Sequence, residues 1–281
     1  EHVASFRMLG LDLLPNLKEL YLEFPNRTPF ENGRYGFDTS ISASLCSLKK
    51  LKLLNAEITS SSYYKLCTSL ETLDMYECKI RENILYCFPN VNKLFFLGVS
   101  ESETDSFIRK QRPPSHLIDE LHISWLNDYI MSTLRTEYRG LNTLCIDFNG
   151  SRDGKKIHLN YNDLCKLNCN TVIIKNVDTV WYRNKEQWEN VESFHIRNLS
   201  FNCWKPPYFL KQENYIRSLN ITISSFINAI RHESFFTGCS CLHELHLRIK
   251  YPFDPYDIQN TIPFNFFRGL ESLSRLTLSG D

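Results

Sequence analysis

The segment CLHELHL, residues 241–247, contains the pattern that decides the fold. Leu242, Leu245 and Leu247 follow the spacing LxxLxL, in which one residue separates the last two leucines. Successive side chains of a strand point to opposite faces, so Leu245 and Leu247 share one face and His246 lies on the other. The segment therefore predicts a short strand whose leucine face is buried.

The same spacing recurs along the whole chain, in eleven units including this one. The central apolar residues are Leu20, Leu51, Leu73, Leu94, Leu121, Leu144, Val172, Phe194, Leu219, Leu245 and Leu276. They span 256 residues in ten steps, a mean of about 25.6, which lies within the period of leucine-rich repeats. The eighth unit is anchored on Val191, Phe194 and Ile196. Many matches in phase are much more specific than one match, because leucine is common.

A repeat of this length contains a strand and a segment that returns the chain to the next strand. No unit can bury its apolar face alone, so neighbouring units must stack. We predict an α/β fold: a leucine-rich-repeat solenoid, or horseshoe, with about eleven parallel strands on the concave face and helices on the convex face. It should form a single domain over residues 1–281. Return helices are expected at 60–67, 81–88, 132–140, 225–236 and 263–271, and exposed inserts at 27–37 and 100–115.

Two thiols and two imidazoles near the quoted segment raise the question of a metal site. Cys239, Cys241, His243 and His246 are residue types that bind zinc, which needs four ligands converging on one point. An extended strand separates these four residues, so we interpret them as parts of the repeat and expect no metal and no cofactor. The ten cysteines are spread along the chain, and we interpret them as the reduced thiols of an intracellular protein.

One pair of repeats resembles a known subtype. The stretch LKKLKLLNAEITSSSYYKLCTSLETLDMYECKI, residues 48–80, is similar to the cysteine-containing leucine-rich repeat. Leu51 and Leu53 match its strand, and Cys67 and Cys78 match its cysteines before and after the next strand. This subtype is typical of F-box proteins, the substrate receptors of cullin–RING (SCF-type) ubiquitin ligases. The resemblance is close over about 35 residues and loose elsewhere.

The resemblance implies a partner set and a location. The chain would recognise a protein substrate, and an F-box preceding residue 1 would bind the ligase adaptor and the cullin. We expect this chain to be a fragment that lacks this F-box, because it begins EHVASF without an initiator methionine. The resemblance also implies a cytoplasmic or nuclear location, or both. The alternative is a leucine-rich-repeat scaffold or regulator outside the ubiquitin system.

Composition and motif searches argue against other classes of protein. The chain has 32 basic and 32 acidic residues, a balance that argues against nucleic-acid binding through a large phosphate footprint. No apolar run approaches the ~20 residues that span a bilayer, so we expect no membrane partner. The chain lacks GxSxG, GxxxxGK[ST] and HExxH motifs. We therefore expect a protein-interaction module and no enzyme.

Candidate partner-binding residues come from the outward strand positions and from the loops that follow strands. In the C-terminal half the outward positions are mostly basic, and aromatic residues gather in the loops. The candidates are Lys175, His195, Arg197, Trp204, Asn220, His246, Arg248, Tyr251, Phe253, Tyr256 and Arg275. The charged residues could equally form an ordinary solvated sheet face, and the aromatic residues could cover the core.

Overall fold

The computed structural model describes residues 14, 16–24, 35–38, 46–59, 66–80, 83–111, 118–148, 157–159, 164–167, 169–181, 196–203, 210, 214–223, 235–249 and 266–280. The chain divides into two compact units: unit 1 is Glu1–Leu141 with Ile146–Gly150, and unit 2 is Asn142–Cys145 with Ser151–Asp281. The order of the eleven principal strands is β1-β3-β5-β7-β8-β9-β11-β12-β13-β14-β15. The predicted α/β fold with an eleven-stranded parallel sheet is confirmed, and the single domain stays a prediction.

Unit 1 contains the more regular repeats. Its main strands are β1 (Glu19–Glu23), β3 (Lys50–Leu54), β5 (Thr72–Tyr76), β7 (Lys93–Leu97) and β8 (Glu120–Ile123), and β9 (Thr143–Asp147) has residues in both units. The predicted central residues Leu20, Leu51, Leu73, Leu94 and Leu121 are direct neighbours in the parallel register. From Leu51 to Leu121 they are fully buried, as the LxxLxL pattern requires.

A second, smaller parallel sheet lies in unit 1 and was not predicted. It consists of β2 (Tyr35–Asp38), β4 (Ala56–Thr59) and β6 (Lys79–Ile80). Phe37 and Ile58 are neighbours in its register and both are buried. The segment 27–37 was predicted as an exposed insert; this is wrong for residues 35–37, which belong to β2 with Phe37 buried, and residues 27–34 lie outside the described residues.

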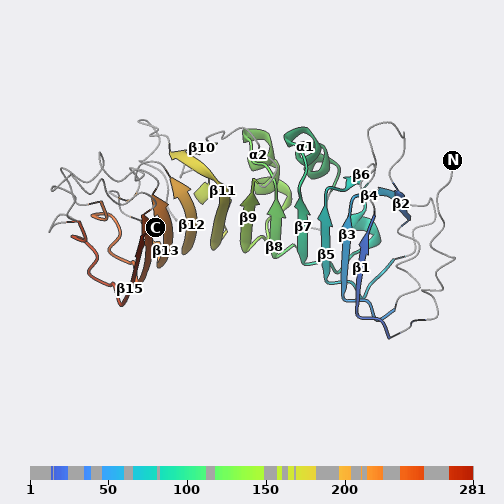
Figure 1. Cartoon of the computed structure of the whole chain (residues 1–281), viewed down its shortest axis with the longest axis horizontal. Coiled ribbons are helices and arrows are strands. Elements are labelled where there is room, and N and C mark those ends of the chain that lie inside the picture. Colours follow the sequence, from blue (N-terminus) through green and yellow to red (C-terminus); the bar gives the residue numbers. More distant parts are fainter. Residues whose placement is uncertain are drawn as a thin grey trace. The chain divides into compact units, whose positions relative to one another are not determined.

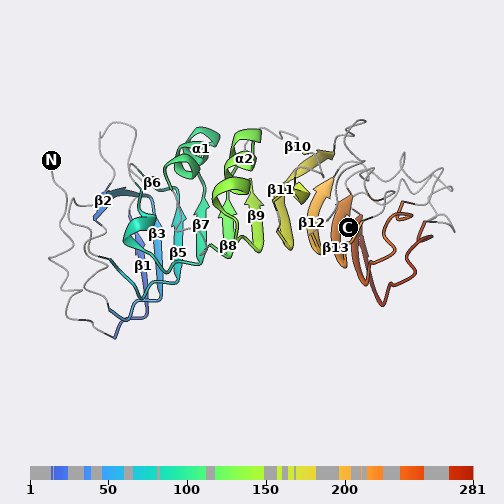
Figure 2. The same ribbon diagram turned by 180° about the vertical axis from the view of Figure 1, so that it is seen from behind.

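Two helices of unit 1 lie side by side in both views (Figures 1 and 2). They are α1 (Glu101–Lys110) and α2 (Asp128–Glu137), and the Arg109 guanidinium lies 3.9 Å from the centre of the Tyr129 ring between them. The prediction of a return helix at 132–140 is confirmed in part, since α2 begins four residues earlier and ends at Glu137. At 81–88 the structure has only a short 3-10 helix, η4 (Leu85–Cys87).

Helix α1 overturns the prediction of an exposed insert at 100–115 for residues 100–111, and residues 112–115 lie outside the described residues. Ser100 caps the helix by accepting from the Glu103 amide, and the Glu103 carboxylate accepts from the Ser100 amide. Phe107 and Ile108 are buried, with Phe107 stacked on Phe96 at 4.2 Å. The Ser-x-x-Glu pattern and the apolar pair were visible in the sequence, but the surrounding charged residues concealed them.

Buried Gln111 joins three repeats of unit 1. Its side-chain oxygen accepts hydrogen bonds from the amides of Ile84 and Leu85, at 2.8 and 3.2 Å, at the start of η4. Its main-chain oxygen accepts from the hydroxyl of Tyr138, a buried residue after α2. Burial raises the pKa of the Tyr138 hydroxyl well above its ordinary value, so the group remains a neutral donor.

The strands of unit 2 other than β10 are longer than those of unit 1, and one of them is irregular. Its strands are β10 (Ile157–Leu159), β11 (Thr171–Trp181), β12 (Asn198–Cys203), β13 (Ser218–Ile223), β14 (Glu244–Ile249) and β15 (Arg275–Gly280). The register of β11 on β12 shifts between Ile173 and Asp178, and Asn176 within the shift has a positive φ of 59°. Leu219 and Leu245 are fully buried, but Leu276 in β15 is 44% exposed.

The predicted register of the eighth repeat is wrong by five residues. Leu199 of β12 pairs with Val172 and Leu219, so the unit is anchored on Ile196, Leu199 and Phe201, all buried. These three residues also fit LxxLxL, and a constant period favoured the wrong alternative. Residues 191–195 of the predicted unit lie outside the described residues. So do 60–65, 225–234 and 263–265 of the predicted return helices, while 235–238 and 266–269 form turns.

Candidate functional site

The outward positions of the strands in unit 1 form a surface with an apolar centre. Leu54, Tyr76 and Leu97 are direct neighbours on β3, β5 and β7 and are all partly exposed. Phe95 lies on the same face of β7, two residues before Leu97, because side chains alternate along a strand. Four apolar side chains therefore gather on the side of the sheet opposite the leucine core.

A glycine at the end of β7 supports this apolar centre. Gly98, directly after β7, has a φ of 73°. A side chain there would approach the Tyr76 ring and the Glu77 side chain to within 2.9 Å. Glycine therefore permits both the turn at the end of β7 and the close approach of the Tyr76 ring.

Beside the apolar centre, Phe95 adjoins a network of charged residues. Phe95 pairs with His122 in the register of β7 and β8, and their rings lie 4.1 Å apart. His122 Nε2 lies 2.8 Å from one oxygen of Glu120, and Lys93 Nζ lies 3.0 Å from the other. Both carboxylate oxygens of Glu120 therefore have a partner: one bonds to the His122 imidazole and the other to the Lys93 ammonium group.

The pKa of Glu120 reflects these partners. Partial burial alone would raise the pKa of this carboxyl, but hydrogen bonds and charge from His122 and Lys93 lower it below its ordinary value overall. The Glu120 carboxyl is therefore ionised at neutral pH. A fixed carboxylate orients His122 against the Phe95 ring.

Lys52 and Tyr21 border the apolar centre on its other side. Lys52 Nζ lies 3.7 Å from an Asp74 oxygen and 5.3 Å from the centre of the Tyr21 ring. The Tyr21 hydroxyl donates to the Glu23 carboxylate at 3.0 Å, and this bond is the main cause of its raised pKa. We define the unit 1 face as this surface: Tyr21, Lys52, Leu54, Asp74, Tyr76, Lys93, Phe95, Leu97, Glu120 and His122.

The corresponding positions of unit 2 are more polar. The outward residues of β12 to β14 are Asn198, Ser200, Asn202, Ser218, Asn220, Thr222, Glu244, His246 and Arg248. Arg275 of β15 donates to the Glu244 carboxylate at 2.7 Å, so these two charges neutralise each other. This face presents amides, hydroxyls and a few charges, whereas the unit 1 face has an apolar centre.

The candidate residues of the sequence fall into three groups. Asn220, His246, Arg248 and Arg275 lie on outward strand positions of unit 2, and Lys175 lies exposed in β11 near its register shift. Arg197 is exposed, but it lies directly before β12 and outside the strand because of the corrected register. His195, Trp204, Tyr251, Phe253 and Tyr256 lie outside the described residues. Partner binding by this set stays a prediction.

The segment that suggested zinc has a structural arrangement of its own. Cys239 is buried; its thiol donates to the Leu210 carbonyl and accepts from the Asn214 amide, both at 3.4 Å. Burial raises the pKa of this thiol to about 11, although the Asn214 bond opposes the effect. His243 is exposed and bonds through Nδ1 to the Cys241 carbonyl at 2.7 Å. Within the part of the chain that the structure describes, no three His, Cys, Asp or Glu side chains are grouped to hold a metal ion.

The unit 1 face was only partly visible in the sequence. Its residues were among the outward positions of the repeats. The candidates were placed in the C-terminal half instead, because the outward positions there are mostly basic and the loops contain aromatic residues. The missed signal is the sequence LFFLG at residues 94–98, in which Phe95 and Leu97 alternate with the core residues Leu94 and Phe96. A strand that is apolar on both faces indicates a covered surface or a binding surface.

Comparisons with known proteins leave the chain without an assigned family. No model of a protein family matches it. No curated protein matches it significantly. Among the described residues, no helix is both long and apolar enough to cross a bilayer.

Proposed function

We propose that this chain is the leucine-rich-repeat, substrate-recognition domain of an F-box protein, and that it binds a protein substrate on its sheet face. The observation that carries the proposal is the unit 1 face, where Tyr76, Phe95 and Leu97 form an apolar centre beside ion-paired charges. Protein interfaces characteristically combine a central apolar or aromatic anchor with a polar rim. A parallel sheet that repeats in sequence order provides such a surface on a rigid support.

The cysteine-type repeat supports the finer assignment. Cys78, which follows β5, is fully buried, and its thiol donates to the Leu53 carbonyl of the preceding strand at 3.4 Å. Cys67, before β5, is buried, and its amide donates to the Cys87 carbonyl of the following repeat. The Cys78 thiol thus joins neighbouring repeats, which is a physical reason for a cysteine at that position, whereas Cys67 joins them through its main-chain amide. In the full proposal the strands line the concave side of a horseshoe.

In this proposal the domain only binds. A partner side chain would pack against Phe95 and Leu97, and polar groups of the partner would contact Lys52, Asp74 or Lys93 at the rim. Much of the binding energy would come from the apolar centre, since exposed ion pairs contribute little net affinity. Ubiquitin transfer would belong to other subunits of the ligase.

The test is affinity purification of the full-length protein from its own cells. We expect the ligase adaptor and the cullin to copurify with it. The control is the same protein shortened to begin at Glu1, which should keep the repeat domain and lose both subunits. If the full-length protein recovers neither subunit, the ubiquitin-ligase assignment is wrong and the scaffold alternative replaces it.

A further inference from the structure

A row of residues lies at the edge where the strands begin. In most repeats, the residue directly before the strand offers its carbonyl to the next repeat: the Lys18 carbonyl accepts from the amides of Lys49 and Lys50, at 2.7 and 3.0 Å. The Lys49 carbonyl accepts from Glu71 and Thr72 in the same way. These main-chain bonds place the side chains of successive repeats next to one another, about 4.8 Å apart. We call this row the strand-start edge.

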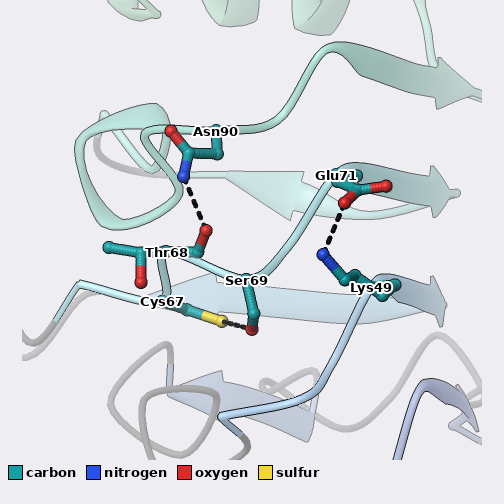
Figure 3. Close-up of polar contacts among 6 residues, drawn as sticks. All are labelled: Lys49, Cys67, Thr68, Ser69, Glu71 and Asn90. Carbon is teal, nitrogen blue, oxygen red and sulfur yellow. Dashed lines mark hydrogen bonds and ion pairs between the residues drawn. The ribbon is translucent and has the colours of Figure 1, made fainter.

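In unit 1 the strand-start edge is electrically balanced. Its members are Lys18, Lys49, Glu71, Asn92 and Asp119, all exposed. Figure 3 shows the ion pair between Lys49 and Glu71, in which Lys49 Nζ lies 2.5 Å from Glu71 Oε1. Positive and negative side chains therefore both occur along this part of the edge, and two of them neutralise each other.

In unit 2 the same edge is basic. The Arg197 amide donates to the Asn170 carbonyl, the Arg217 amide to the Arg197 carbonyl, and the His243 amide to the Arg217 carbonyl, at 2.7–2.8 Å. Arg197, Arg217 and His243 are therefore neighbours, and all three are exposed. Among the described residues, neither arginine forms an ion pair with an acid.

The described acid nearest in sequence to this row does not compensate its charge. It is Glu244, and Arg275 already bonds to it at 2.7 Å. The His243 ring bonds through Nδ1 to the Cys241 carbonyl, an acceptor only, so Nδ1 carries the hydrogen, and Nε2 of the neutral ring can accept from an amide or hydroxyl of a partner. Two guanidinium groups and an imidazole thus form an exposed row across three repeats.

We propose that Arg197, Arg217 and His243 form a docking site for an acidic, extended peptide segment of a partner protein. Arginine binds carboxylates through paired, planar hydrogen bonds, and neighbouring arginines would engage successive acidic side chains. A linear row suits a linear segment better than a single compact anion. The balanced net charge of the chain argues against a long nucleic-acid track. This site goes beyond the substrate face and does not require the ubiquitin-ligase assignment.

The experiment measures binding of a fluorescent synthetic peptide in which glutamate alternates with serine. The double variant Arg197→Gln, Arg217→Gln is compared with the intact chain, and circular dichroism checks that both are folded. The matched control is Lys18→Gln, Lys50→Gln, which removes the same charge from two exposed lysines of unit 1. We expect the arginine variant to bind the peptide at least about tenfold more weakly and the lysine variant to match the intact chain.

Three results would overturn the proposal. The first is that the intact chain does not prefer the glutamate peptide to one with glutamine in its place. The second is equal weakening in the arginine and lysine variants, which would indicate general electrostatics. The third is tighter binding of a single-stranded RNA of equal charge, lost in the arginine variant, which would assign the row to nucleic acid.

Discussion

The two units share the same kind of core and differ in what they present to solvent. Leu94 in unit 1 and Leu245 in unit 2 occupy the same place in the repeat, and both are fully buried. Outside the core, unit 1 presents Phe95 and Leu97 on its sheet face and a balanced strand-start edge. Unit 2 presents Asn220 and Arg248 on its face and a basic edge. The repeat thus fixes the buried positions and leaves the outward ones open to different chemistry.

The largest expected effect tests the shared core. Leu94→Ala and Leu245→Ala should each lower the free energy of unfolding by about 2–5 kcal/mol, because each leaves a cavity in a packed core. Leu276→Ala should cost less than about 1 kcal/mol, because Leu276 in β15 is 44% exposed. Chemical denaturation of the three variants measures these values. Equal costs at Leu245 and Leu276 would contradict the arrangement of β14 and β15.

A smaller loss of stability is expected when the buried side-chain amide of Gln111 in unit 1 or of Asn214 in unit 2 is removed, and the two losses should differ. Gln111→Leu removes an oxygen that accepts two main-chain amides in unit 1, and should cost about 1–3 kcal/mol. Asn214→Leu in unit 2 loses a bond to the Cys239 sulfur at 3.4 Å and one from the Ile216 amide at 3.3 Å. Its cost should be smaller, because sulfur is a weak acceptor. A larger loss at Asn214 in thermal or chemical unfolding would reverse this ranking.

The smallest loss of stability is expected on replacing Glu120 or Glu244, two acidic residues that each form an ion pair with a residue of a neighbouring strand. Glu120→Gln in unit 1 should cost about 1 kcal/mol or less at neutral pH, and Glu244→Gln in unit 2 only a few tenths, because the Glu244–Arg275 pair is more exposed. The folded-state pKa of Glu120 lies below its unfolded value. Its contribution is therefore present above the unfolded pKa of about 4.3 and is lost as the pH falls through the folded pKa.

Stability of the Glu120→Gln variant and the original chain should be compared from neutral to acidic pH. The gap between them should narrow as the pH falls below about 4.3. A gap that stays constant through this range would show that the carboxylate does not stabilise the fold through its charge.

Periodicity predicted the fold well because the core repeats. Ten of the eleven central residues were placed correctly, since each must fill the same position under its neighbours. Phe194 was wrong because two overlapping LxxLxL matches exist near residue 196, and only pairing of β12 with its neighbours decides between them. Helix α1 was missed because its charged residues outnumber Phe107 and Ile108.

The surfaces were harder to predict than the core. The unit 1 face depends on register: Phe95 meets His122 because β7 and β8 pair without a shift across an intervening helix. The strand-start edge depends on the corrected position of β12, which places Arg197 beside Arg217. Neither adjacency follows from spacing along the chain, because both join residues that are twenty or more positions apart.

The most direct measurement is a quantitative comparison of the proteins that copurify with three forms of the full-length protein. These are the unaltered protein, Phe95→Ser and Ser200→Ala. Phe95 and Ser200 occupy equivalent outward positions in β7 and β12, so the second variant is a matched control. We predict that Phe95→Ser lowers recovery of the substrate protein at least about tenfold while retaining the ligase adaptor, and that Ser200→Ala retains both. Unchanged recovery of the same proteins with Phe95→Ser would contradict the account.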